Sequence, residues 1–170
     1  MSPSLIIMLG IFPFVMAYAA ASDLVSMKIS NRLCLSLVGT FAVCAVLAGL
    51  SLHDIAWHVA AGLLVLVGAF GLFAAGWIGG GDAKLAAATA LWFGFDQLMP
   101  YLLLSSFGGG LLTLLILQLR AHPLPAPVAS WAWARRLHAP KEGVPYGIAL
   151  AFAALLILPE TAIWHAALGI

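Results

Sequence analysis

The sequence predicts an all-α integral membrane protein, and three observations lead to this class. Of the 170 residues, 64% are hydrophobic and only 8% are charged, whereas soluble domains carry roughly 25% charged residues. The mean hydropathy of the chain is +1.12. Apolar runs of about 20 residues, the length that crosses a bilayer as a helix, recur along the whole chain. A net charge of +1 excludes nucleic acid as a partner on electrostatic grounds.

Six apolar segments are the expected transmembrane helices. Only Pro100 and the polar pair at 96–97 separate the fourth segment from the fifth, which predicts a tight helical hairpin at the membrane surface. The first segment precedes the first basic residue, Lys28, so it lacks the positive n-region of a secretory signal. We therefore expect it to be a retained membrane helix. The six segments are 4–22, 33–52, 56–76, 84–99, 101–119 and 146–168.

The basic residues predict the orientation of these helices. All seven Lys and Arg residues fall in the first, third and fifth connections, and none falls in the second connection (51–55), the fourth turn or either terminus. Cytoplasmic loops of membrane proteins carry the excess of Lys and Arg. The odd-numbered connections should therefore face the cytoplasm, and both termini should be extracytoplasmic.

The fifth connection, residues 120–145, is the only sizeable segment outside the predicted helices. It opens with a proline-rich piece at 122–127, which should be extended. Residues 128–138 then mix Trp131 and Trp133 with arginines, a composition typical of an interfacial helix on the cytoplasmic leaflet. A plain aromatic anchor is favoured over a substrate-binding role. With no soluble segment large enough for its own core, residues 1–170 are expected to form a single membrane domain.

Residues 76–85 form the stretch around which the chain is organised. Asp82 follows three consecutive glycines and precedes the apolar run 84–99. An ionisable residue at the edge of the hydrocarbon layer is costly and marks a functional site by default. The alternative is a glycine-rich break between two helices, with Asp82 as the N-cap of the second helix.

A second carboxylate, Asp23, is expected at the same depth on the same face. It ends the first span on the cytoplasmic side, whereas Asp54, Asp96 and Glu160 fall on the outer side. Two carboxylates held close together cannot both ionise cheaply, so one stays a base and the other an acid. Two unconnected helix caps, or a site for a cation or a proton, are the competing explanations.

No metal or cofactor site is expected elsewhere in the sequence. His53, Asp54 and His58 are near one another in the chain, but their spacing does not establish the converging geometry that a metal needs. Cys34 and Cys44 lie in one apolar run without C-x-x-C spacing, so we interpret them as buried structural thiols.

Three motifs in chain order resemble the type IV prepilin peptidases, a family of membrane aspartic peptidases. Residues 79–82 satisfy the G-x-G-D signature of such peptidases. Asp23, followed by Ile29 and Asn31, resembles the first-aspartate motif of the family. Residues 144–147, Val-Pro-Tyr-Gly, are similar to a further family motif. The resemblance covers nearly the whole chain.

The resemblance implies an endopeptidase of the bacterial cytoplasmic (inner) membrane that removes the short basic leader of prepilin-like proteins on the cytoplasmic side, after a glycine. It implies Asp23 and Asp82 as the catalytic pair, with supporting roles for Gly79, Gly81, Lys84 and Asn31. No cofactor is implied. The partners would be a prepilin-like substrate and the lipid bilayer, with the pilus assembly machinery as a further candidate.

One departure from the family pattern narrows this prediction. Larger members carry an insertion with paired C-x-x-C motifs near the N-terminus and also methylate the new N-terminus, whereas the first connection here has about ten residues and no cysteine. Methyltransferase activity is therefore not expected, and the chain resembles the short, peptidase-only form associated with Flp-type pili. The alternative function is a small membrane transporter or scaffold whose aspartate pair binds a cation or a proton.

Overall fold

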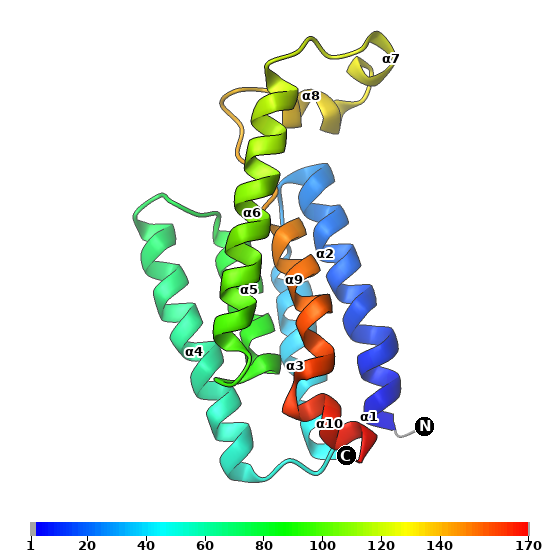
Figure 1. Cartoon of the computed structure of the whole chain (residues 1–170), viewed down its shortest axis with the longest axis vertical. Helices are drawn as coiled ribbons and strands as arrows, with labels where there is room; N and C mark the ends of the chain where they lie inside the picture. The colour runs from blue at the N-terminus through cyan, green and yellow to red at the C-terminus, as the bar shows by residue number, and fades with distance from the viewer. Residues whose placement is uncertain (1–2, 170) are drawn as a thin grey trace.

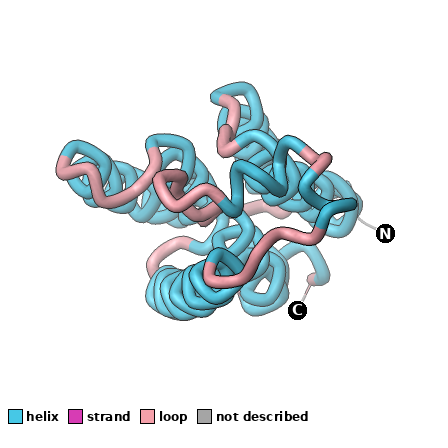
Figure 2. Tube along the Cα trace, turned by 90° about the horizontal axis from the view of Figure 1, so that it is seen from above, coloured by secondary structure: helices cyan, strands magenta, loops and turns pink. Residues whose placement is uncertain are grey.

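The computed structural model describes residues 3–169 as a bundle of helices. Every regular element between these residues is a helix, and the helices run roughly parallel when the bundle is viewed end-on (Figure 2). The first and last helical elements, α1 (Pro3–Ile6) and α10 (Ala162–Leu168), pack against each other at one end of the bundle, as Figure 1 shows. We call this the terminal end and the opposite end the loop end.

The chain first rises from the terminal end to the loop end. Here α1 continues through a short π-helical turn, η1 (Ile7–Ile11), into α2 (Phe12–Ser26), and together they form a 24-residue stretch apolar enough to cross a membrane. Helix α3 (Asn31–Leu47) returns to the terminal end. Its N-cap is Ser30, whose side chain accepts a hydrogen bond from the backbone N–H of Leu33.

Helices α4 (Leu52–Ala74) and α5 (Gly80–Phe93) form the next pair. A Schellman motif ends α4: Gly76 takes a left-handed φ of 76°, and the N–H of Trp77 donates to the carbonyl of Leu72, which satisfies carbonyls at the helix end. Helix α5 has only 14 residues, and its side chains from Leu85 to Phe93 are buried. It is the central helix of the bundle, because α3, α4, α6 and α9 all pack on it.

The turn between α5 and α6 (Leu98–Arg120) differs from the sequence prediction. The hairpin was expected between the segments 84–99 and 101–119, with the pair 96–97 and Pro100 as its separators. In the structure α5 ends at Phe93, the pair 96–97 lies in the turn, and Pro100 lies in the first turn of α6. Gly94, with a left-handed φ of 58°, ends α5 instead. Proline is tolerated in a first helical turn because its missing N–H would have no partner there. The predicted end of the fourth segment is therefore wrong by several residues.

The connection after α6 holds two short helices at the loop end (Figure 1). These are α7 (Ala126–Ala129) and α8 (Ala132–His138), so the helix expected over 128–138 is interrupted at Ser130–Trp131. Residues 122–125 of the proline-rich piece lie outside any helix, whereas residues 126–127 begin α7. Arg120 stabilises the fold of this connection, because its guanidinium donates to the carbonyls of Leu137, Glu142 and Gly143.

The last pass combines α9 (Gly147–Ile157), a 3-10 turn, η2 (Leu158–Glu160), and α10, with a bend of 49° at the break. Among residues 3–169, three helical stretches are long and apolar enough to cross a membrane, and this bent pair is a fourth candidate. The structure is thus an α-helical membrane protein. The three stretches are Pro3–Ser26, Leu52–Ala74 and Leu98–Arg120.

Small residues and aromatic rings fill the core. Trp92 of α5 packs against Phe12 and Phe41 with ring centroids 4.8 and 5.8 Å apart, and its indole N–H donates to the carbonyl of Leu37. In α6, Gly109 lies against the ring of Tyr146: a Cβ at Gly109 would be 2.0 Å from that ring. Gly108 and Gly109 of the glycine segment therefore serve internal packing against Ala149 and Tyr146, the use that small residues have between membrane helices, whereas a Cβ at Gly110 would meet no heavy atom within 4 Å.

Candidate active site

The residues that the sequence singled out line one cavity at the loop end of the bundle. This cavity has a volume of about 570 Å³ and is formed by the end of α2, the start of α3, the start of α5 and the connections before α3 and α5. Segments far apart in the sequence therefore meet at one place. The predicted site residues that line it are Asp23, Asn31, Gly79, Gly81, Asp82 and Lys84.

Asp23 lies in the last turn of α2 and is only 5% exposed. Met27 ends the helix in a left-handed conformation, with φ of 53°, and its N–H donates to the carbonyl of Asp23. The hydroxyl of Ser22 donates to the carbonyl of Lys28 at 2.7 Å. These bonds fold the connection 27–30 back over the helix end, so the Asp23 carboxylate faces the bundle interior instead of the solvent.

Asp82 is the third residue of α5, and Gly79 is the N-cap. The interpretation of Asp82 as the N-cap is therefore wrong. Its carboxylate instead reaches back to the backbone of Gly79, as acidic residues at the third helical position commonly do. Its second oxygen, Oδ1, is buried and has no hydrogen-bond partner among residues 3–169. A buried acceptor without a partner is costly, so this oxygen is suited to carry a proton or to meet a ligand.

Burial is the main influence on the charge of Asp82, which precedes the segment 84–99 and lies in none of the candidate membrane helices. Burial raises the pKa of Asp82 to about 7, and the negative charge of Asp23 adds to this rise. The backbone N–H groups of Gly79 and Gly147 oppose it. Asp23 and Asp82 line the same cavity, and the charge of one acts on the pKa of the other.

Gly147, the first residue of α9, contacts the aspartate site from a third direction. Its N–H donates to Oδ2 of Asp23 at 2.8 Å. A Cβ at this position would lie 2.9 Å from Asp23 Oδ2 and 2.9 Å from Cδ1 of Ile29, closer than carbon atoms normally approach. The sequence analysis did not name Gly147 as a site residue, although the motif at 144–147 contained the signal.

Asn31 and Lys84 form one edge of the cavity. The Lys84 ammonium, from α5, donates a hydrogen bond to the Asn31 side-chain oxygen, from the first residue of α3. The bond joins two helices beside the aspartates. Next to it, Gly81 lies against Ile29, where a Cβ would come within 3.3 Å of the Ile29 Cβ. The glycines at 81 and 147 thus allow Ile29 to pack between the starts of α5 and α9.

The polar residues at the terminal end have structural partners. Asp54 and Ser51 form a capping box at the start of α4. The His58 ring is buried, with Nδ1 2.8 Å from the carbonyl oxygen of Leu91, and it packs against Gly94. The part of the chain that the structure describes holds no group of three or more His, Cys, Asp or Glu side chains placed to bind a metal ion.

A helical membrane protein with two facing carboxylates in one polar cavity belongs to a class that can perform acid–base chemistry at the membrane surface. A sequence model of the type IV leader peptidase family matches residues 10–114. This segment is more than half of the chain and contains all six predicted site residues. The chain therefore belongs to the type IV leader peptidase family. Comparisons with curated proteins and with solved structures gave no match.

Proposed function

We propose that this protein is an aspartic endopeptidase that removes the basic leader peptide of prepilin-like membrane proteins, cutting after a glycine on the cytoplasmic side. The observation that carries the proposal is the cavity lined by both Asp23 and Asp82, with the N–H of Gly147 bonded to the Asp23 carboxylate. Membership of the type IV leader peptidase family supports the class of reaction. The cavity supports the aspartic mechanism, because it supplies two carboxylates in unlike surroundings.

The unlike surroundings assign a role to each carboxylate. Asp23 accepts a hydrogen bond from the Gly147 N–H and, within residues 3–169, has no buried oxygen without a partner, so we assign it as the base. Asp82, with a buried and unpartnered Oδ1, carries the proton of the pair and acts as the acid. Because the carboxylates interact, the pair titrates as a unit, and these roles describe its most populated form near neutral pH.

In the proposed reaction, Asp23 takes a proton from a water molecule while the water oxygen attacks the carbonyl carbon of the scissile peptide bond. The resulting tetrahedral intermediate collapses when Asp82 gives its proton to the leaving nitrogen. The C–N bond breaks, and the products are a leader with a free carboxyl group and a pilin with a free amino group. Water is the only co-reactant, so no cofactor takes part.

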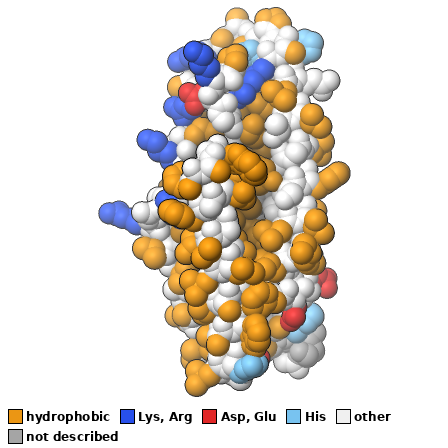
Figure 3. All heavy atoms as spheres, turned by 90° about the vertical axis from the view of Figure 1, so that its left-hand side faces the viewer, with side chains coloured by type: hydrophobic (Ala, Val, Ile, Leu, Met, Phe, Trp, Pro, Cys, Tyr) orange, Lys and Arg blue, Asp and Glu red, His pale blue; other side chains and the backbone are white. Residues whose placement is uncertain are grey.

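The proposed topology places the loop end of the bundle in the cytoplasm. The chain crosses the bundle six times between its two ends, in the order α1–α2, α3, α4, α5, α6 and α9–α10. On the face shown in Figure 3, the Lys and Arg side chains lie toward the loop end, as expected for a cytoplasmic surface. The protein would then be a six-span inner-membrane protein of one domain, with both termini extracytoplasmic.

The proposed activity is limited to peptide cleavage. Only residues 27–30 connect α2 to α3, which leaves no room for the cysteine-containing insertion of the larger enzymes. Cys34 and Cys44 are instead buried within α3. This supports the short form that processes Flp-type prepilins, with the pilus assembly machinery as a further partner.

Co-expression with a Flp-type prepilin tests the proposal. Leader removal is followed by a gel shift for the wild type, Asp23→Asn and Asp82→Asn, with exposed Asp96→Asn at the terminal end as the matched control and immunoblotting of membranes to verify insertion. We expect cleavage by the wild type and the control and none by the two site variants. Normal cleavage by either site variant contradicts the mechanism. Cleavage by none of the four chains would favour a transporter or scaffold with an ion-binding aspartate pair.

A further inference from the structure

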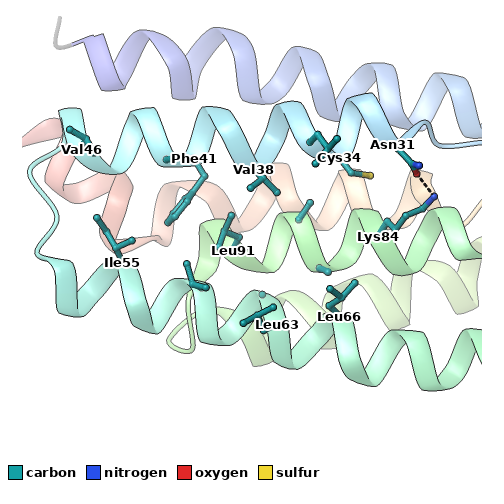
Figure 4. Close-up of a pocket in the computed structure, with 16 residues that line it drawn as sticks. Asn31, Cys34, Val38, Phe41, Val46, Ile55, Leu63, Leu66, Lys84 and Leu91 are labelled. Atoms are coloured by element: carbon teal, nitrogen blue, oxygen red, sulfur yellow. Dashed lines mark hydrogen bonds between the residues drawn. The ribbon is translucent and has the colours of Figure 1, made fainter.

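A long apolar groove lies on the surface of the bundle between α3 and α4, with α5 as its floor (Figure 4). Its volume is about 620 Å³. It exists because α3 and α4 both pack on α5 and hardly on each other. Along its walls are apolar side chains with large exposed fractions, among them Leu35 at 68% and Leu63 at 55%.

The groove has the length and the floor that a membrane helix needs. Lining residues of α3 extend from Asn31 to Val46, a distance of about 22 Å at 1.5 Å per residue, most of the hydrocarbon thickness of about 30 Å. Three of the lining residues are small: Gly62 of α4 and Ala87 and Ala88 of α5. Small residues let a second helix backbone come close, which is how helices associate in lipid.

The polar lining of the groove is confined to the end next to the aspartates. Figure 4 shows the hydrogen-bonded pair Asn31 and Lys84 at one end, with Val46 and Ile55 at the other. Asn31 and Lys84 also line the cavity that holds Asp23 and Asp82. The groove and the aspartate cavity are therefore adjacent spaces that share this pair as their common wall.

We propose that the α3–α4 groove seats the apolar membrane helix of the substrate, with the cytoplasmic end of that helix at the Asn31–Lys84 pair. The inference rests on the proposed peptidase function and specifies how the substrate binds. A substrate helix seated in this groove leaves the hydrocarbon layer beside the Asn31–Lys84 pair. The extended segment of the substrate that precedes this helix then enters the aspartate cavity. The scissile bond is then delivered to the carboxylates by the position of the helix.

A second hollow, on the other side of α4, is the natural competitor. It lies between α4 and α6 and has a volume of about 420 Å³, with Asp82 and Tyr146 in its lining. On α4, which borders both spaces, its lining residues extend from Leu64 to Leu72 and those of the α3–α4 groove extend from Ile55 to Leu66, about 12 Å and about 16 Å at 1.5 Å per residue. The α3–α4 groove is therefore the longer seat for a helix.

Neighbouring residues of α4 give a matched test. Leu63 lines the α3–α4 groove and Leu64 lines the α4–α6 hollow, and their exposed fractions are 55% and 57%. A photo-reactive benzoylphenylalanine is placed at each position in an Asp82→Asn chain, which keeps the Flp-type prepilin uncleaved, and adducts are identified by mass spectrometry. We expect the position-63 probe to capture the apolar helix of the prepilin and the position-64 probe to capture lipid.

Kinetics in the active chain provide the second measurement. Leu63→Trp should raise KM for the prepilin about tenfold with little change in kcat, because overfilling a packed contact costs on the order of one decade in binding. Leu64→Trp should process the prepilin as the wild type does. This difference separates a binding role from a general loss of stability, since both variants place the same ring on the same helix.

The outcomes separate this inference from the proposed function. Capture of the prepilin at position 64 and not at 63 overturns the groove assignment, as does capture of lipid alone or of a second copy of this chain at position 63. In each case the peptidase function stands if the wild type still cleaves. If the wild type does not cleave the prepilin, the proposed function fails, and the inference fails with it.

Discussion

Replacement of Gly147 by alanine tests how closely the aspartate site is packed. The new methyl group would lie 2.9 Å from Asp23 Oδ2 and 3.1 Å from Asp23 Cβ, whereas ordinary contacts begin near 3.5 Å. Asp23 must therefore move by about half an ångström. A misplacement of 1 Å at a catalytic site costs about 100-fold in rate, so we expect cleavage to slow by about 10- to 100-fold.

The assay is a time course of leader removal from a purified prepilin in detergent micelles. Gly143→Ala is the matched control, because Gly143 lies just before α9 and a Cβ there has no heavy atom within 4 Å. The loss of cleavage rate in Gly147→Ala should appear in kcat and not in KM, since the residues that contact the substrate are unchanged. Wild-type kcat in Gly147→Ala would refute the reasoning that the Gly147 contact positions Asp23.

Two further predictions concern protonation and packing. Because burial raises the pKa of Asp82 to about 7, the acid form of the pair is lost as the pH rises through that value, and kcat should fall about tenfold per unit above it. In Gly109→Val, the side chain would overlap the Tyr146 ring, whose hydroxyl donates to the carbonyl of Ser105 at 3.0 Å. The ring must move, which should destabilise the bundle by about 1–3 kcal/mol and lower the Tm in detergent.

Each of these predictions has a result that would contradict it. A kcat that stays constant from pH 6 to pH 9 would show that no general acid with the expected pKa takes part. For the packing prediction, Gly110→Val is the control, because a Cβ at Gly110 has no heavy atom within 4 Å. Equal melting temperatures for the two valine variants would show that the Tyr146 contact contributes nothing.

Of the six expected spans, three stretches and the bent pair α9–α10 are long and apolar enough to cross a membrane within residues 3–169. Hydropathy predicted that the apolar runs are helices, because an apolar run must become a helix in lipid to satisfy its backbone. It located their ends less well. Helix α5 is buried on nearly every side, so its composition gives no amphipathic pattern from which to read a boundary. The turn at Gly94 was missed for this reason. At the break of the loop helix at Ser130–Trp131, the Arg135 guanidinium donates to the carbonyls of Ala129 and Ser130, an arrangement that composition alone did not predict.

The sequence was enough to name the site residues, but not to predict how they are arranged in space. Local motifs pointed to Asp23 and Asp82 separately, and the structure places both in one cavity. The motif at 144–147 marked Gly147, but its hydrogen bond to Asp23 could not be predicted, because it joins residues 124 positions apart. The likeness of Asp82 to an N-cap was misleading, since an acid at the third helical position satisfies the same helix end by reaching back to Gly79.

The most direct test of the account is a double-mutant comparison of the two aspartates. Rates of leader removal by the purified wild type, Asp23→Asn, Asp82→Asn and the double variant are measured on one prepilin. Groups that act as a unit give losses that do not add, so the double variant should be no slower than the slower single variant. Losses that multiply, or a wild-type rate in either single variant, would contradict the claim that Asp23 and Asp82 act together on one bond.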